Sequence, residues 1–80
     1  MTDNRVSLSS VRPGETVKIS VINGGCNLNR RLADMGLVPG TSVRVLRGHG
    51  MGPTLVELRG SQLVLGFGVA QKVMVEKPGG

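Results

Sequence analysis

The chain has 80 residues, which allows one domain, and its 10 Lys and Arg against 5 Asp and Glu give a net charge of +5. Its single cysteine, Cys26, excludes an internal disulfide framework, and no apolar run approaches the roughly 20 residues that span a bilayer. No secretory signal is visible and valine dominates the apolar residues, so we expect a small, soluble, cytoplasmic, mostly β domain.

The first strand is expected at residues 16–22. A flexible tail over residues 1–7 and the turn Arg12-Pro13-Gly14-Glu15 precede it. Apolar and polar side chains alternate along it, and this period of two indicates a half-buried strand. The face expected to point inward carries Val17, Ile19 and Val21.

One convincing helix follows the glycine pair at residues 24–25. Asn27 is suited to be its N-cap, and an apolar stripe follows at helical spacing. The stripe consists of Leu28, Leu32 and Met35. Gly36 is the expected left-handed residue at the helix end, and Leu37 stands where an apolar residue often packs back. A helix of about two turns cannot stand alone, so it must dock on the sheet.

The second half of the chain consists of short predicted strands separated by turns. Val38-Pro39-Gly40-Thr41 has the Pro-Gly order of a type II turn. Strands are expected at residues 42–47, 54–59, 62–65 and 73–76, and the first of these points Val43 and Val45 inward. The connections are a long loop (48–53), a tight turn at Gly60-Ser61, a corner at Gly66-Phe67-Gly68 and a helical turn (69–72).

These elements predict a small closed or nearly closed barrel, because closure removes exposed strand edges. An SH3-like barrel and an OB-fold both satisfy the pattern, and the short strands favour the SH3-like barrel. We therefore predict a mostly β, SH3-like barrel of about five strands with one short α-helix. The domain spans residues 8–76, and residues 77–80 form a C-terminal tail.

Catalysis is not expected. The acidic residues are scattered over tail, turn, helix and strands, whereas acid–base chemistry needs paired ionisable groups in one cleft. They are Asp3, Glu15, Asp34, Glu57 and Glu76. A pair of Cys26 and His49 would lack a third residue to orient it.

No cofactor is expected, and the metal-binding signal is weak. Zinc needs about four ligands, and the spacing of His49, Cys26, Met51 and Asp34 matches no ligand signature. His49 and Cys26 remain the weak candidates. Two chains could share a metal through paired His49 loops, so self-association stays open.

Nucleic-acid binding is an alternative that the positive charge raises and other features oppose. A pI near 10.8 favours contact with phosphates. However, Phe67 is the one aromatic residue on which a base could stack, and the basic residues are dispersed over every element. A solvated basic surface is the simpler interpretation.

The stretch RLADMGLVPGT, residues 31–41, followed by the strand Val43-Arg44-Val45, resembles the signature of the ferrous-iron transport protein A (FeoA) family. That signature has RL, a short helix, then MG, an apolar residue and PG before a strand. The residues that match it are Leu32, Met35, Gly36, Leu37, Pro39 and Gly40. They seat and end the helix and turn the chain into the next strand, so they identify a fold. The resemblance covers about residues 8–76.

The resemblance implies an accessory or regulatory protein of ferrous-iron uptake. By this resemblance the chain is expected to bind the cytoplasmic side of the permease FeoB, at its guanine-nucleotide-binding domain or its membrane region, close to the membrane. Related barrels occur in iron- and manganese-dependent repressors, so a nucleic-acid-binding or repressor-like module is the alternative. No helix-turn-helix segment is present, and no nucleic-acid partner is expected. By analogy with other SH3-like barrels, the partner-binding residues are predicted to be Asn27, Arg30, Arg31, His49 and Met51.

Overall fold

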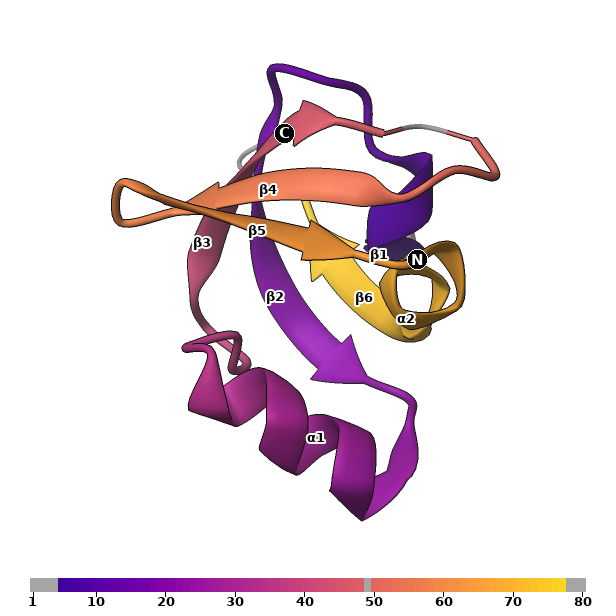
Figure 1. Ribbon diagram of the computed structural model, residues 1–80, viewed down its shortest axis with the longest axis vertical. Helices are drawn as coiled ribbons and strands as arrows, with labels where there is room; N and C mark the ends of the chain where they lie inside the picture. Colours follow the sequence, from indigo (N-terminus) through magenta and orange to yellow (C-terminus); the bar gives the residue numbers. More distant parts are fainter. Residues whose placement is uncertain (1–4, 49, 78–80) are drawn as a thin grey trace.

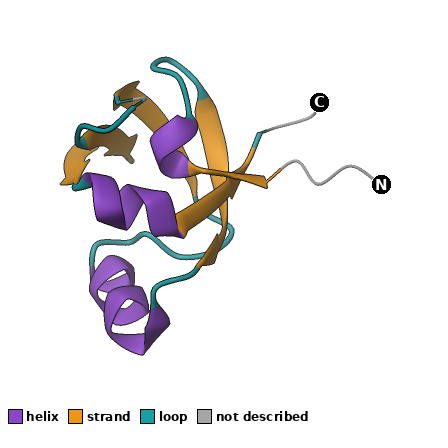
Figure 2. Cartoon of the chain, turned by 90° about the vertical axis from the view of Figure 1, so that its right-hand side faces the viewer, coloured by secondary structure: helices purple, strands orange, loops and turns teal. Residues whose placement is uncertain are grey.

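The computed structural model describes residues 5–48 and 50–77. Within them, one antiparallel sheet with the strand order β1-β6-β2-β3-β4-β5 curls around a single core (Figure 1). The strands are β1 (Arg5–Ser7), β2 (Thr16–Ile22), β3 (Ser42–Arg47), β4 (Thr54–Leu58), β5 (Ser61–Leu65) and β6 (Val73–Glu76). The helices are a 3-10 helix (Leu8–Ser10), α1 (Gly25–Asp34) and α2 (Phe67–Lys72). They lie one above another on the side of the sheet that faces the viewer in Figure 2.

The core is built from aliphatic side chains, and valine is the most frequent of them. Seven valines are at most 1% exposed, and all but one lie on strands, where branched side chains fill the inner face of the pleated sheet. They are Val11, Val17, Val43, Val45, Val56, Val73 and Val75. The predicted inward positions Val43 and Val45 are therefore confirmed.

A bulge in β2 changes which residues of that strand face the core. Ile19 pairs with Val75 of β6, but Val21 pairs with Met74, so Ser20 is an extra residue on β2. One extra residue moves the following side chains to the other face of the sheet. Val17 and Ile19 are buried as predicted, whereas Ile22 is buried in place of Val21, which is only half-buried. The prediction for Val21 is wrong for this reason.

The predicted N-terminal tail extends too far. Residues 5–7 form β1, which pairs with β6 through Arg5 to Glu76, Val6 to Val75 and Ser7 to Met74. Three residues are too short for an alternation pattern to be recognised, and the strand they join lies at the other end of the sequence. The sheet therefore has six strands rather than about five.

Helix α1 begins earlier than predicted and ends as predicted. Its N-cap is Gly24, so Asn27 lies within the first turn and does not cap the helix. Leu28 packs directly over Gly24, where a Cβ would overlap the leucine side chain, so a glycine permits the helix to start there.

The C-terminal end of α1 is a Schellman motif. Gly36 has a φ of 89°, and its N–H donates to the Ala33 carbonyl at 2.9 Å. The Leu37 N–H donates to the Leu32 carbonyl at 2.8 Å, and the Leu37 side chain is 1% exposed. Gly36 supplies the left-handed backbone and Leu37 packs back on the helix, as the sequence predicted.

Two boundaries in the second half of the chain differ from the predictions. Leu58 pairs with Ser61, so the hairpin turn is Arg59-Gly60 rather than Gly60-Ser61. Arg59 has a φ of 53°, a conformation that a two-residue hairpin turn requires and that sequence patterns assign to glycine or asparagine. The second helix begins at Phe67 rather than at residue 69, so most of the predicted corner belongs to α2.

The Thr54 hydroxyl gives a first testable prediction. Thr54 is 0% exposed, and its Oγ1 has no hydrogen-bond partner among the described residues. A buried polar atom without a partner costs about 1–3 kcal/mol, so we expect Thr54→Val to raise the free energy of unfolding by about 1 kcal/mol. Urea unfolding followed by circular dichroism measures this, with exposed Thr16→Val on β2 as the control. A loss of stability in Thr54→Val would mean that the hydroxyl has a partner.

Candidate functional site

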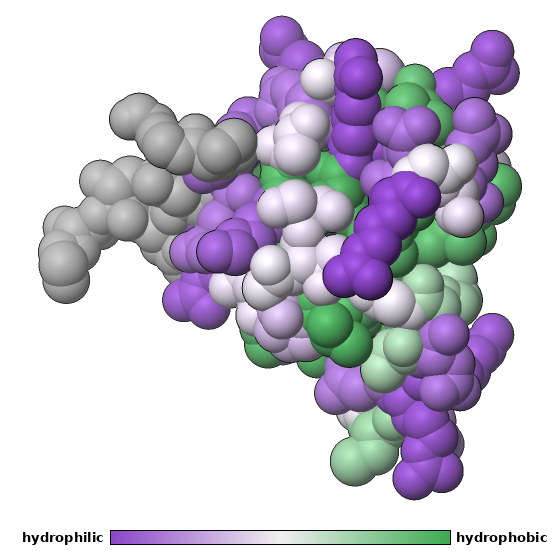
Figure 3. All heavy atoms as spheres, turned by 90° about the vertical axis from the view of Figure 1, so that its left-hand side faces the viewer, coloured by the Kyte–Doolittle hydropathy of each residue, from purple (hydrophilic) through white to green (hydrophobic). Residues whose placement is uncertain are grey.

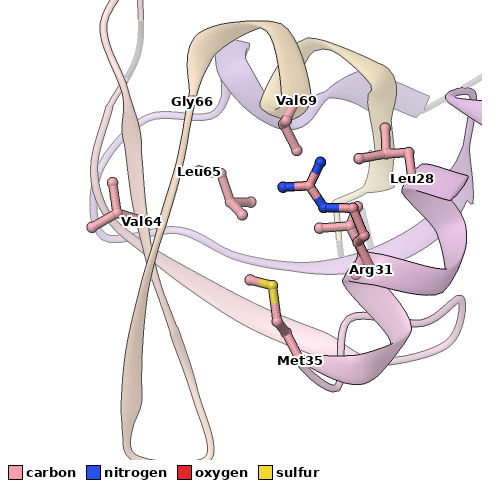
Figure 4. A pocket seen from close by; sticks show the side chains of 8 residues that line it. Leu28, Arg31, Met35, Val64, Leu65, Gly66 and Val69 are labelled. Carbon is pink, nitrogen blue, oxygen red and sulfur yellow. The ribbon is translucent and has the colours of Figure 1, made fainter.

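An open apolar groove lies between helix α1 and the end of β5, and we call it the α1–β5 groove. It encloses about 450 Å³, including the part open to solvent (Figure 4). Its walls come from α1 with its C-cap residue, from the end of β5 and from α2. The lining residues are Leu28, Arg31, Leu32, Met35, Val64, Leu65, Gly66 and Val69.

The groove exists because the apolar stripe of α1 only partly reaches the core. Leu32 is 3% exposed and fixes the helix to the sheet, while Leu28 is half-buried. Met35 is 39% exposed, so it does not seat the helix as the sequence predicted. On the opposite wall, the buried Leu65 points into the groove, whereas Val64 is 67% exposed and points away from α1 (Figure 4). A large apolar side chain such as Met35, in contact with water beside a hollow, is typical of a binding surface.

Arg31 is the one charged residue among those that line the groove. It lies on the exposed side of α1, and Figure 4 shows its guanidinium reaching across the space between α1 and Val69. Its aliphatic stem lies along the apolar wall while the charged head meets solvent. An arginine in this position can donate several hydrogen bonds to a carboxylate of a bound partner.

The acidic residues of the sheet are matched by basic residues. Glu57 on β4 stands opposite Arg44 on β3, and Glu76 on β6 stands opposite Lys18 on β2. The Glu15 carboxylate lies 3.6 Å from the Lys77 ammonium in an exposed ion pair. Figure 3 shows hydrophilic side chains projecting over one face with apolar patches between them. The basic residues with no acidic residue opposite them in these pairs are Arg12, Arg30, Arg31, Arg47, Arg59 and Lys72, and two of them lie on α1.

The structure does not bring the predicted partner-binding residues into one site. Asn27, Arg30 and Arg31 are exposed on α1, and Arg31 lines the groove. Met51 is 84% exposed on the loop between β3 and β4, which lies at the opposite end of the long axis from α1 (Figure 1). That loop is tied to the 3-10 helix, since the Gly50 N–H donates to the Ser9 carbonyl at 3.3 Å. His49 lies outside the described residues.

Sequence reasoning missed the β5 and α2 walls of the groove. Leu63, Val64 and Leu65 are three consecutive apolar residues in a strand, which breaks the alternation expected when one face meets water. Val64 is the exposed residue of this run. The break in alternation is the signal from which the β5 wall of the groove could have been predicted. Met35 was assigned to the core because helical spacing does not show where a helix extends past the sheet.

Cys26 has an exposed free thiol in the first turn of α1. Over residues 5–48 and 50–77, no group of three or more His, Cys, Asp or Glu side chains is arranged to hold a metal ion. Within the same ranges, no helix is long and apolar enough to cross a membrane.

The known proteins that this chain resembles agree on one family. A family model described as the FeoA domain matches residues 6–77. A Methanocaldococcus jannaschii protein named putative Fe(2+) transport protein A is 36% identical over 69 residues, covering 86% of this chain and 83% of that protein. A crystal structure described as iron uptake regulatory protein (FeoA) superposes with a TM-score of 0.84 at 40% identity, covering 91% of this chain and 97% of the other.

The same fold also occurs in a larger protein. A manganese-dependent transcriptional repressor in complex with manganese superposes with a TM-score of 0.84 at 24% identity. The match covers 96% of this chain but 38% of the repressor, and at this identity the two share the fold alone. Together with the FeoA structure, it confirms the predicted mostly β, SH3-like fold.

Proposed function

This chain belongs to the FeoA domain family, and we propose that it is an accessory protein of ferrous-iron uptake that binds the cytoplasmic side of a FeoB-type permease by protein–protein contact. The family model spans nearly the whole chain, and two of its relatives are named for iron transport or for regulation of iron uptake. In this proposal the protein acts by binding and carries out no chemistry of its own.

The observation that carries the proposal is the α1–β5 groove. Binding energy at protein interfaces concentrates in a few apolar or arginine side chains that fill or line a pocket. Met35 and Arg31 meet that description, because an exposed apolar side chain and an arginine share one hollow. We place the centre of the contact at these residues, with Asn27 and Arg30 on the same helix as flanking contacts. A second contact at the His49–Met51 loop would be separate from it.

A matched pair of variants tests the proposal. Met35 and Val38 are both 39% exposed, but only Met35 lines the groove. Met35→Glu should weaken binding to the purified cytoplasmic nucleotide-binding domain of the cognate permease by about tenfold or more, because it places a charge in an apolar contact. Val38→Glu should leave the affinity within about twofold. Isothermal calorimetry measures both, with GDP and with a GTP analogue bound.

Two results would contradict the proposal. An absence of heat and of NMR shifts in the wild-type protein at high micromolar concentration, in both nucleotide states and with the detergent-solubilised permease, would exclude direct binding. Equal losses for Met35→Glu and Val38→Glu would show that the groove is not the contact. A steep salt-dependent affinity for single-stranded oligonucleotides would instead favour the nucleic-acid alternative.

A further inference from the structure

Strand β5 is an open edge of the sheet. In a two-residue hairpin the flanking pair, Leu58 and Ser61, is hydrogen-bonded, and bonded pairs then alternate along the ladder. Leu63 and Leu65 therefore bond to β4, while the backbone N–H and C=O groups of Gln62 and Val64 point away from it. Outside the ladder, no described residue bonds to these four groups.

The two edges of the sheet are protected to different degrees. Proteins usually protect an edge strand by making it short or by placing charges, proline or a bulge in it. The β1 edge has three residues and carries Arg5. The β5 edge has five residues, Ser61–Leu65, with no charge, no proline and a continuous register against β4. It is the less protected of the two edges.

The open edge and the groove meet at Val64. Its backbone groups face outward at the edge beside the α1–β5 groove, while its side chain points away from α1 and the neighbouring Leu65 side chain points into the hollow (Figure 4). A strand added beside β5 would lie about 4.8 Å from it, with alternate side chains directed toward the apolar wall of α1. The Arg31 side chain extends over the same space (Figure 4). Its guanidinium is therefore placed to bind a carboxylate of the added strand.

We propose that the partner binds by adding an extended segment to β5 as a further strand, with apolar side chains in the α1–β5 groove and a carboxylate on Arg31. The segment carries its apolar residues and one acidic residue at alternate positions, so that they share the face that meets the groove. This inference rests on the proposed function for the identity of the partner, but its geometry comes from the edge and the groove. The main-chain bonds provide affinity, and the groove with Arg31 provides specificity.

Charge decides between an acidic partner and a second copy of the chain. The protein carries a net charge of +5, and the one charged residue in the groove lining is a cation. Pairing β5 with β5 of a second copy would bring two positively charged molecules together and leave both Arg31 side chains without a carboxylate from the lining residues. An acidic segment avoids the repulsion between two positively charged molecules and supplies a carboxylate to Arg31.

Two matched pairs of variants test the mode of binding. Val64→Pro removes the outward N–H without touching the β4 ladder, a position where an edge strand tolerates proline, whereas Val64→Thr keeps the N–H and the shape. Arg31→Gln removes the groove cation, and Arg12→Gln removes an exposed cation on the turn before β2, outside the groove lining. We expect Val64→Pro and Arg31→Gln each to weaken binding by about tenfold, and both controls to bind within about twofold.

Two probes keep the inference separate from the proposed function. The first is the cytoplasmic nucleotide-binding domain of the permease. The second is a synthetic peptide, acetyl-Ser-Val-Glu-Val-Glu-Glu-Ser-amide, in which both valines and the last glutamate share one face. One variant is N-methylated at these three residues, and another at the two glutamates between them. In an added strand, the N–H groups of alternate residues donate hydrogen bonds to β5, and N-methylation removes these donors. One methylated variant should therefore lose binding and the other should keep it. Hydrogen exchange at the Gln62 and Val64 amides should slow by about tenfold or more in either complex.

Each outcome decides one question. Binding of the permease domain that Val64→Pro leaves unchanged, with no protection at Gln62 and Val64, would overturn strand addition and leave the proposed function standing. Binding of the peptide alone would support strand addition and reject the permease domain as partner. Failure of both probes would overturn the inference. Concentration-dependent protection of these amides in the free protein would identify a second copy as the occupant instead.

Discussion

Replacing Leu37 by alanine should lower the free energy of unfolding by about 2–5 kcal/mol. Leu37 is 1% exposed and follows directly on the Schellman motif that ends α1, so its side chain fixes the helix against the core. Alanine would leave a cavity there, and a small domain has few other contacts through which to relax. Small domains are stable by only about 5–15 kcal/mol, so this loss is a large fraction of the total free energy of unfolding.

The measurement is urea unfolding followed by far-UV circular dichroism, because the chain has no Trp or Tyr for fluorescence. Val38→Ala is the control, as the neighbouring side chain is 39% exposed and should change stability by less than about 0.5 kcal/mol. If Leu37→Ala were as stable as Val38→Ala, the packing of α1 described above would be incorrect. Leu37→Ala should also weaken partner binding, because it loosens the packing of α1, which forms one wall of the α1–β5 groove.

Replacing Gly48 by alanine should cost about 2–3 kcal/mol. Gly48 has a φ of 141°, and a Cβ there would lie 3.0 Å from the Thr54 Oγ1, 3.1 Å from its Cγ2 and 3.3 Å from its Cα. Two penalties therefore add, one from a backbone conformation that L-residues avoid and one from contact with a fully buried residue that has no room to move.

Gly50 separates these two penalties. Its φ is 121°, yet a Cβ built there would meet nothing within 4 Å. Gly50→Ala should therefore cost about 1 kcal/mol, for the backbone term alone, and the difference between the two variants reports the contact with Thr54. Equal costs for the two variants would mean that Thr54 yields to the added methyl group.

The sequence predicted those elements whose signals are local. The strands at residues 42–47 and 73–76 have the predicted bounds, because alternation and flanking turns mark both of their ends. The end of α1 was also predicted, since Gly36 and Leu37 form a motif that lies within six residues. Elements of this kind depend little on what the rest of the chain does.

The features that the sequence did not predict depend on distant partners. β1 is a strand only because β6 offers it an edge, and the bulge at Ser20 appears only when β2 is set against β6. The positive φ of Arg59 is imposed by the hairpin that it closes. In each case the residue itself carries no sign of the conformation that the tertiary structure requires.

The candidate site was predicted only in part for the same reason. Arg31 is predicted as a partner-binding residue by analogy with other SH3-like barrels, and it lines the groove. Met35 lies on that stripe and was assigned to the core, although it is 39% exposed. The groove joins α1 to a strand about thirty residues later in the sequence, so its existence follows from the packing of the two elements rather than from either segment.

The pairing of β1 with β6 brings the two ends of the described chain together. Arg5 stands opposite Glu76 in the ladder, so the polypeptide enters and leaves the domain at neighbouring points of one strand pair. A domain whose ends meet can be attached to another protein, or inserted into one of its loops, without rearranging the sheet. In the manganese-dependent repressor, the region that shares this fold makes up 38% of the chain.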